Sequence, residues 1–237
     1  MAEATARKRL VIRRATPTFT GALDQDFAGA MPVKYQKDAA SACRSAAAWD
    51  DQNLYVGWEV KDATPWVNGA DAPEFLYARG DTVDLQLGLR ADAPKDRKEA
   101  GLGDVRISIG AFQGKTTVVA YRKVAAEKNP KTFNSGVTKG YVMESVVLLE
   151  PARINVKIDP VGKRYVVEAA LPWSALGFSP AGGEVLRGDF GATHGDRSGT
   201  DTVLRTHWSN QNTGLVSDEV YELAMTPAAW GDLELER

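Results

Sequence analysis

The sequence has few of the residue types that most enzymes use for chemistry. Its 237 residues include two histidines, His194 and His207, and one cysteine, Cys43. A single cysteine excludes an intramolecular disulfide, and its position between Ala42 and Ala46 favours a small core residue. The sequence contains no HExxH, CxxC, GxSxG or Walker pattern. It therefore offers no motif for metal-assisted hydrolysis, thiol redox chemistry, acyl transfer or nucleotide binding.

The chain also has little net charge and no long apolar run. The 29 Lys and Arg residues nearly balance the 31 Asp and Glu residues, which gives a formal net charge of -2. Nucleic-acid binders need a basic field, so we expect no nucleic-acid partner. No apolar run approaches the ~20 residues of a membrane-spanning helix, so we expect no membrane insertion. The N-terminal MAEATARKRLVIRR lacks the apolar region of an intact signal peptide.

No apolar pattern at helical spacing lasts longer than a few turns. Many short stretches instead alternate apolar and polar residues, as strands with one buried side do, and turn residues separate them. These stretches are 10–12, 54–60, 81–89, 104–112, 116–121, 142–149, 154–158, 164–171, 186–193 and 203–208. They predict an all-β fold, an antiparallel β-sandwich of the immunoglobulin-like or jelly-roll-like type with very short helical turns. No linker or repeat divides the chain, so we expect one domain over residues 1–237.

The best-patterned stretch is 48–62, AWDDQNLYVGWEVKD, which predicts a β-hairpin. Alternate residues from Leu54 to Val60 fall on one face of its second strand, and residues 50–53 have the Asp and Asn side chains of a tight turn. We assign four tryptophans to the packed structure: Trp49, Trp58, Trp173 and Trp230.

Two polar residues on strands are the best candidates for ligand binding. Asp84 in DTVDLQLGL and Arg106 in DVRISIG both point away from the apolar face of their strand. A carboxylate and a guanidinium offer an acceptor and a planar donor fork to a hydroxyl-rich ligand. The same two residues are also consistent with a simple cross-strand ion pair.

The segment 63–79 is a long loop that keeps large aromatic residues. It contains Pro65, Gly69 and Pro73 together with Trp66, Phe75 and Tyr77. Loops usually expose polar groups, so the retained rings indicate either a tucked-in Ω-loop or a binding surface. Aromatic rings beside Asp84 and Arg106 would suit sugars, because sugar rings stack their C–H faces on such rings.

Taken in order, these motifs resemble a known family. The motifs that carry the resemblance are, in order, AWDDQNLYVGWEVKD, GDTVDLQLG, DVRISIG, YVVEAALPWSALGF, FGATHGD with HWSN, and PAAWGDLEL. This series is similar to the family 9 carbohydrate-binding modules and their DOMON-like relatives. The similarity covers nearly the whole chain, from about Gly21 to Leu235. It implies an antiparallel β-sandwich with a non-catalytic, sugar-binding role and no required cofactor. It also implies an appended module of a larger secreted protein, and hence an extracellular or periplasmic location.

The resemblance also assigns site residues. The acidic strand position of the family falls on Asp84, and its strand arginine falls on Arg106. At the first tryptophan of the family's sugar clamp this chain has Tyr77, with Trp66 further upstream. The second tryptophan should follow HWSN, where this chain has no tryptophan. We therefore expect Trp66 and Tyr77 to stack on a sugar, with Trp208 either joining them or packing in the core. We expect Asp84, Arg106, Asn210 and Asn212 to form hydrogen bonds with the sugar.

Two other functions remain open from the sequence. Haem-binding DOMON-like domains use side-chain axial ligands, for which this chain offers Met31, Met143, His194, His207 or a lysine. A structural interaction domain would bind no small ligand, and its site would be filled by its own loop. Structural calcium is known in the family that the chain resembles. Acids near turns that could supply oxygen ligands are Asp24, Asp26, Asp62 and Asp71.

Overall fold

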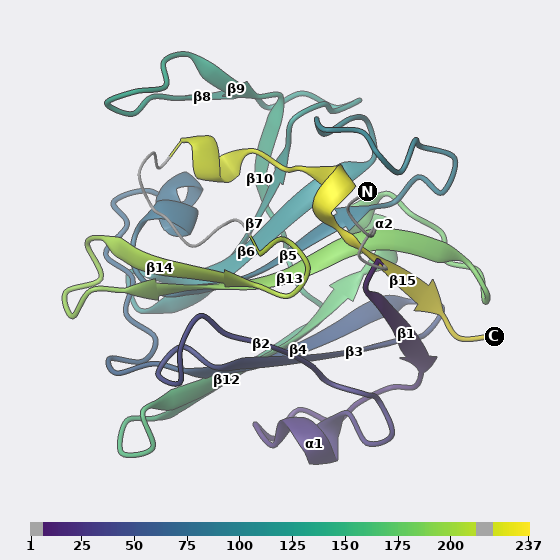
Figure 1. Cartoon of the computed structure of the whole chain (residues 1–237), viewed down its shortest axis with the longest axis horizontal. Helices are drawn as coiled ribbons and strands as arrows, with labels where there is room; N and C mark the ends of the chain where they lie inside the picture. Colours follow the sequence, from purple (N-terminus) through teal and green to yellow (C-terminus); the bar gives the residue numbers. More distant parts are fainter. Residues whose placement is uncertain (1–6, 212–219) are drawn as a thin grey trace, which may run out of the picture.

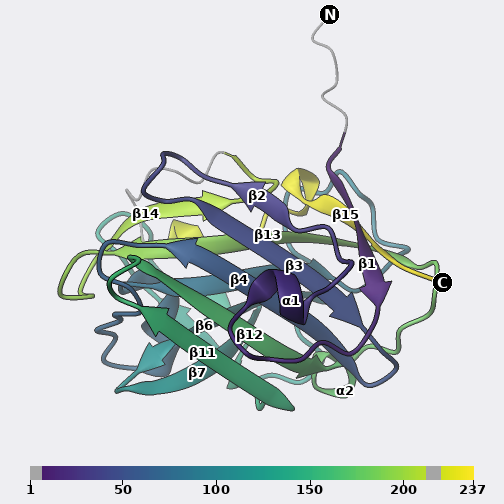
Figure 2. The same ribbon diagram turned by 90° about the horizontal axis from the view of Figure 1, so that it is seen from below.

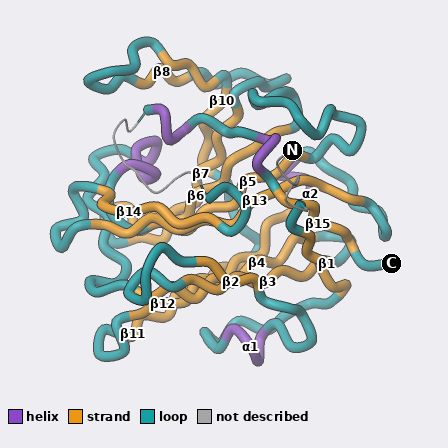
Figure 3. The backbone as a smooth tube through the Cα atoms, viewed as in Figure 1, coloured by secondary structure: helices purple, strands orange, loops and turns teal. Residues whose placement is uncertain are grey.

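A computed structural model describes residues 7–211 and 220–237 of the chain. These residues form two stacked β-sheets (Figure 1), connected by loops and short helical turns (Figure 3). The upper sheet of Figure 1 contains β5 (Thr82–Gly88), β6 (Asp104–Phe112), β7 (Lys115–Arg122), β10 (Ser145–Leu148), β13 (Val185–Gly195), β14 (Thr202–His207) and β15 (Gly231–Leu235). The lower sheet contains β1 (Arg9–Arg14), β2 (Val33–Tyr35), β3 (Cys43–Trp49), β4 (Asn53–Lys61), β11 (Arg153–Asp159) and β12 (Arg164–Pro172). A separate hairpin pairs β8 (Lys131–Phe133) with β9 (Tyr141–Met143).

The two sheets are joined at one edge by β1. In the strand order β10-β7-β6-β5-β13-β15-β1-β3-β4-β12-β11, this strand lies between β15 and β3. It runs parallel to both, with Leu10 opposite Leu233 and Arg14 opposite Trp49. The other ladders of the sandwich are antiparallel. The all-β sandwich is therefore confirmed, and the two pairings of β1 are its parallel exceptions.

The space between the sheets holds the main hydrophobic core. Alternate residues of each strand point into it, and the Trp58 ring of β4 meets the Phe190 ring of β13 at a centroid distance of 6.3 Å. Trp49, Trp58, Trp173 and Trp230 are all buried, as expected. Removing a buried aromatic side chain of this kind costs about 3 to 5 kcal/mol of stability.

The predicted hairpin of residues 48–62 is present as β3, a turn and β4. The Asp50 carboxylate accepts hydrogen bonds from the backbone amides of Gln52 and Asn53, both at 2.8 Å, which closes the turn. Such side-chain bonds to nearby amides are the reason why Asp favours turns. The opposite face of the hairpin is also covered, because Tyr55 is buried under the N-terminal segment.

The helical elements are short, as the sequence predicted: α1 (Leu23–Asp26), η1 (Pro73–Ala78), α2 (Trp173–Leu176), η2 (Tyr221–Leu223) and η3 (Pro227–Ala229). Among the described residues, no helix has the length and apolar character needed to cross a membrane. Figure 2 shows α1 lying over the outer face of the lower sheet.

A carboxyl pair holds this N-terminal segment to the lower sheet. Buried Glu168 of β12 accepts hydrogen bonds from Gly21 N and Asn155 Nδ2, both at 2.9 Å. Burial, together with the adjoining Asp26 carboxyl, raises the pKa of Glu168 to about 7. Burial would also raise the pKa of Asp26, but hydrogen bonds from Thr18 and its neighbours hold that pKa far below its usual value. Below about pH 7 the pair therefore holds one proton, which sits on Glu168, and it loses this proton as the pH rises through 7.

The outer face of the upper sheet is covered by a second apolar layer. This layer consists of η1, the β8–β9 hairpin and the segment around η2 and η3, which lie above the upper sheet in Figure 1. Its rings pack edge to face, with Tyr77 of η1 contacting both Tyr121 of β7 and Phe133 of β8. Polar side chains on this face of the sheet are consequently enclosed.

Candidate functional site

The polar residues of the upper sheet share its outer face. On β5, Val83, Leu85 and Leu87 enter the main core, and Asp84 therefore points the other way. In the ladder, Asp84 lies opposite Ser108 of β6 on one side and Gly191 of β13 on the other. The alternation read from the sequence thus places Asp84 on the correct side of its strand.

Arg106 lies on the same face and contacts Asp84 directly. Arg106 is opposite Gln86, one step along the ladder from Asp84, and its Nη2 donates to Asp84 Oδ2 at 2.8 Å. The two side chains are 2% and 0% exposed. The structure therefore brings the two predicted residues together in an enclosed site.

A glycine makes room for this contact. A Cβ atom built on Gly191 would lie 2.6 Å from His207 Cε1 and 3.0 Å from Asp84 Oδ1. Such distances are shorter than a carbon atom tolerates, so Gly191 is needed for the Asp84 and His207 side chains to lie over the strand.

Strand β14 adds two residues that the sequence reasoning did not assign to a sugar site, Arg205 and His207. Arg205 of β14 lies opposite Thr193, and His207 lies opposite Gly191. His207 Nδ1 is 3.4 Å from the carboxylate of Asp189, and Arg205 Nη1 donates to the carbonyl of Tyr77 at 2.9 Å. The only sequence signal for Arg205 was its position in the alternating stretch 203–208.

An acid from outside the sheet completes the cluster. Glu222 lies on η2, and its Oε2 is 3.2 Å from Arg205 Nε. Its main-chain carbonyl accepts a hydrogen bond from Arg106 Nη1. Four strands and one helical turn thus bring together the buried polar cluster, which consists of Asp84, Arg106, Asp189, Arg205, His207 and Glu222.

The buried polar cluster has unused hydrogen-bonding capacity. Among the described residues, five buried side-chain atoms of the cluster have no hydrogen-bond partner: Asp84 Oδ1, Arg106 Nε, His207 Nδ1, Arg205 Nε and Arg205 Nη2. Arg205 Nε is near Glu222, but its N–H is not directed at the carboxylate. Unpaired buried donors and acceptors cost free energy and are uncommon in native proteins. The cluster can therefore accept polar atoms from a ligand.

The pKa values of the cluster reflect its burial. Desolvation lowers the pKa of Arg205 to about 10, although Glu222 acts in the opposite direction. Desolvation likewise raises the pKa of Glu222, against the effect of Arg205. Burial would lower the pKa of His207, but the charges of Asp84 and Asp189 outweigh it and raise that pKa. In this buried site, the charged form of each side chain is therefore stabilised by the opposite charge of its neighbour.

The aromatic residues expected to stack on a sugar are placed differently. Tyr77 is 1% exposed because the second apolar layer encloses its ring. Trp208 is 5% exposed, and its ring contacts Phe190 in the core between the sheets. Neither ring is exposed in this structure, so the two rings do not form an open stacking surface here, and their role in sugar binding remains a prediction. Alternation puts Trp208 on the core side because its neighbour His207 occupies the outer side.

Trp66 is half-buried and lies away from the cluster. Its ring packs on Tyr165 of the lower sheet with a centroid distance of 5.1 Å. Its φ angle of 66° is in the left-handed region, which is unusual for a bulky residue. The 63–79 loop is thus a tucked-in segment whose aromatic residues serve two different apolar layers.

Of the two asparagines expected to bind a sugar, Asn210 and Asn212, the structure describes only Asn210. The backbone amide of Asn210 donates to Asp189 Oδ2 at 2.9 Å, which places Asn210 beside the buried polar cluster. Asn212 lies outside the described residues. The binding roles expected for Asp84, Arg106 and Asn210 remain predictions.

The proposed haem and calcium ligands do not form common sites. His194 and His207 lie on opposite faces of the upper sheet, Met31 is 80% exposed, and Met143 is enclosed in the second apolar layer. Asp24 pairs with Arg44, whereas Asp62 pairs with His194. Within the described ranges, no group of three or more His, Cys, Asp and Glu residues is arranged to hold a metal ion.

A second polar cluster lies at the end of the sheets. His194 Nδ1 is 3.0 Å from Asp62 Oδ2, and all of these groups are buried. Burial would lower the pKa of His194, but the hydrogen bond to Asp62 and the neighbouring Cys43 raise it to about 9. Burial and the charge of Asp62 raise the pKa of nearby Asp81 to about 7. Asp81 accepts hydrogen bonds from Val67 N and Gly195 N, so this cluster anchors the 63–79 loop.

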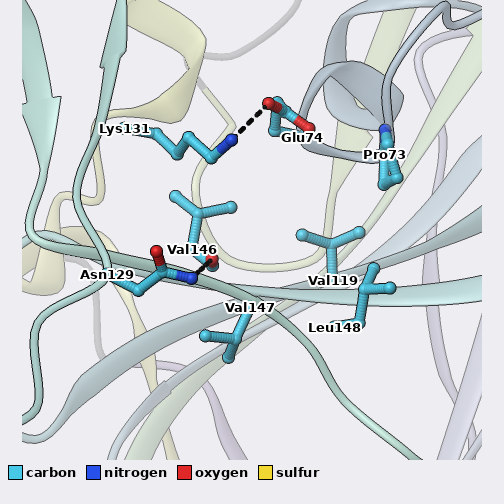
Figure 4. Close-up of a pocket in the computed structure, with 8 residues that line it drawn as sticks. All are labelled: Pro73, Glu74, Val119, Asn129, Lys131, Val146, Val147 and Leu148. Atoms are coloured by element: carbon cyan, nitrogen blue, oxygen red, sulfur yellow. Dashed lines mark hydrogen bonds and ion pairs between the residues drawn. The ribbon is translucent and has the colours of Figure 1, made fainter.

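A groove of about 400 Å³ opens at the β10 edge of the upper sheet (Figure 4). Val119 lies in its floor, and Val119 is opposite Ser108, which is opposite Asp84. The groove is thus on the same face as the buried polar cluster, two strands away from Asp84. Its walls include an ion pair between Lys131 Nζ and Glu74 Oε1 at 2.9 Å.

Comparison with solved structures places this fold among known proteins. A family 9 carbohydrate-binding module from Caldicellulosiruptor kristjanssonii, solved in complex with cellotriose, is similar with a TM-score of 0.60 and 17% identity. The match covers 97% of this chain and 94% of that one. The chain has the fold of a family 9 carbohydrate-binding module.

Two further solved structures are similar to this chain. A family 9 module from C. kristjanssonii in complex with glucose matches with a TM-score of 0.60 and 16% identity, over 97% of both chains. A candidate carbohydrate-binding protein from Bacteroides uniformis matches with a TM-score of 0.54 and 14% identity, over 98% of this chain and 100% of that one. No family model and no curated protein matches the sequence.

Proposed function

We propose that this protein is a non-catalytic carbohydrate-binding module whose site is the buried polar cluster on the upper sheet. The observation that carries the proposal is the set of unpaired donors and acceptors on Asp84, Arg106 and Arg205. The fold similarity to modules solved with cellotriose and glucose supports it.

The chemistry of the cluster suits adjacent hydroxyl groups. A carboxylate accepts two hydroxyl hydrogens, and a guanidinium donates a planar pair of N–H bonds to hydroxyl oxygens. Asp84 and Arg106 present both functions within 2.8 Å of one another. Low exposure to water strengthens such bonds, although each one replaces a bond between the sugar and water.

The wider setting follows from the same proposal. We infer that the module belongs to a larger carbohydrate-active protein, outside the cytoplasm, and targets it to a polysaccharide. The protein itself would need no catalytic residue and no cofactor for this role.

A binding titration against oligosaccharides and polysaccharides tests the function. The wild-type protein should bind at least one glycan, and Arg106→Gln should weaken that binding at least tenfold. Arg9→Gln is the matched control, because Arg9 makes an exposed ion pair with Glu234 on β1. Equal loss in both variants, or no binding by the wild type to a broad panel, would contradict the proposal.

One observation favours the alternative of an interaction domain without a small ligand. Glu222 already contacts both arginines of the cluster, so the site is partly filled by the chain itself. The same titration separates the two functions. A sugar-binding site requires that a glycan competes with Glu222, whereas an interaction domain remains silent to every glycan.

A further inference from the structure

The charges of the buried polar cluster form three pairs, of which only two lie wholly on the sheet. Arg106 pairs with Asp84 at 2.8 Å, and His207 is 3.4 Å from Asp189. The third cation, Arg205, has its counter-charge on η2, where Glu222 Oε2 is 3.2 Å away. Without Glu222, the sheet would therefore hold an uncompensated guanidinium.

Arg205 is incompletely bonded even with Glu222 in place. Its side chain is 0% exposed, and within the described part of the chain Nη1 alone donates a directed hydrogen bond, to the carbonyl of Tyr77. Among the described residues, Nε and Nη2 have no hydrogen-bond partner, and neither has Arg106 Nε. These N–H groups lack an acceptor, whereas among the fully buried carboxylate oxygens of the described cluster only Asp84 Oδ1 lacks a donor. The cluster therefore lacks mainly hydrogen-bond acceptors, and a ligand oxygen near Arg205 would supply one.

Glu222 occupies the position where such an acceptor would bind. Its carboxylate faces Arg205 and its carbonyl accepts from Arg106, so one residue meets both guanidinium groups. A ligand that reaches the arginines must displace these contacts. A neutral sugar would then leave Arg205 buried without a counter-charge, and an uncompensated buried charge is strongly destabilising.

A carboxylate on the ligand removes this cost. It would replace the charge of Glu222 and supply two oxygens to the unused N–H groups of Arg205, in the planar geometry that guanidinium prefers. The ring hydroxyls of the same sugar would remain available to Asp84, whose Oδ1 is unpaired.

We infer that the ligand of this site is an acidic sugar, a hexuronic acid residue whose carboxylate replaces that of Glu222 on Arg205. This inference rests on the proposed function, because it names the class of sugar for the same site. Glu222 then acts as an internal competitor that holds the site closed in the absence of ligand.

The test compares sugars that differ only in charge. Trigalacturonate and triglucuronate, their methyl esters and cellotriose are titrated into the wild-type protein by calorimetry. At least one uronate should bind tenfold or more tightly than its methyl ester, and its affinity should fall as NaCl is raised. If neutral sugars bind as tightly as the uronates, the inference is wrong and the proposed function stands. If no sugar binds, both fail.

Two variants locate the carboxylate. Arg205→Gln should abolish the difference between uronate and methyl ester, and Glu222→Gln should increase uronate affinity at least threefold because it weakens the internal competitor. Circular dichroism establishes that each variant is folded; if Arg205→Gln does not fold, Glu222→Gln and the ester comparison decide. Arg9→Gln serves as the control. Uronate affinity that is unchanged or reduced by Glu222→Gln would overturn the inference.

Discussion

Arg106 and Asp84 form a diagonal ion pair across neighbouring strands, 2.8 Å apart and almost inaccessible to water. Arg106 is in register with Gln86, and Asp84 is in register with Ser108, so the long arginine side chain spans one ladder step to reach the acid. A buried pair of this kind behaves differently from an exposed one. Removing one partner leaves the other charge without compensation.

Arg106→Ala should therefore lower the free energy of unfolding by about 3 to 5 kcal/mol. Urea denaturation followed by tryptophan fluorescence measures this change. The control Arg9→Ala removes an exposed ion pair and should cost less than ~1 kcal/mol. A loss of less than ~1 kcal/mol for Arg106→Ala would show that the pair is not buried in solution.

Gly191→Ala should disturb the cluster without removing any of its charged groups. The new methyl group would meet His207 and Asp84 at distances below normal contact, so we expect a loss of about 1 to 3 kcal/mol in stability and a weaker site. Gly136→Ala is the control, because no atom lies within 4 Å of the Cβ it would gain. Equal melting temperatures for the two variants would contradict the close approach at Gly191.

The stability of the protein should fall as the pH rises from 6 to 9. The pKa of His194 is raised from 6.5 to about 9, so its stabilising contribution is complete below pH 6.5 and is lost as the pH rises through 9. The pKa of Asp81 is raised from 3.8 to about 7, so its contribution is lost as the pH rises through 7. We expect a combined loss on the order of 1 to 3 kcal/mol, visible as a lower melting temperature. A melting temperature that rises towards pH 9 would contradict this.

Glu168→Gln should reduce part of this pH dependence. The pKa of Glu168 is raised from 4.5 to about 7, so the folded state favours its neutral form and loses stability as the pH rises through 7. Glutamine is neutral at every pH and can keep the bonds from Gly21 and Asn155. The variant should match the wild type near pH 5 and exceed its melting temperature at pH 8. Equal pH profiles would show that no proton is shared with Asp26.

The sequence predicted the features that depend on local pattern. Alternation placed every second residue from Leu54 to Val60 in the core. It placed Asp84 and Arg106 on the face of their strands that points away from the core, because side chains alternate between the two faces of a strand. The Asp50 turn was predicted for the same reason, since its hydrogen bonds reach only two and three residues along the chain.

The remaining features depend on contacts between distant segments. Glu222 reaches Arg106 across 116 residues, and the pairing of β13 with β14 brings Arg205 beside it. A three-residue turn such as η2 is too short to have a periodic pattern, so its position against the sheet cannot be predicted from the sequence. The sequence left open whether Tyr77 is tucked in or exposed. The structure encloses Tyr77 because a second apolar layer covers this face of the sheet, and no local pattern predicts what covers a strand.

The most direct test of the account observes the two arginines while a sugar binds. The Nε–H signals of Arg106 and Arg205 can be followed in nitrogen-proton correlation spectra and assigned with Arg106→Lys and Arg205→Lys. Because both Nε atoms lack a hydrogen-bond partner among the described residues, a bound glycan should shift both signals with the same saturation curve as the calorimetric titration. A glycan that binds tightly but leaves both signals unmoved would place the binding site elsewhere and contradict the account.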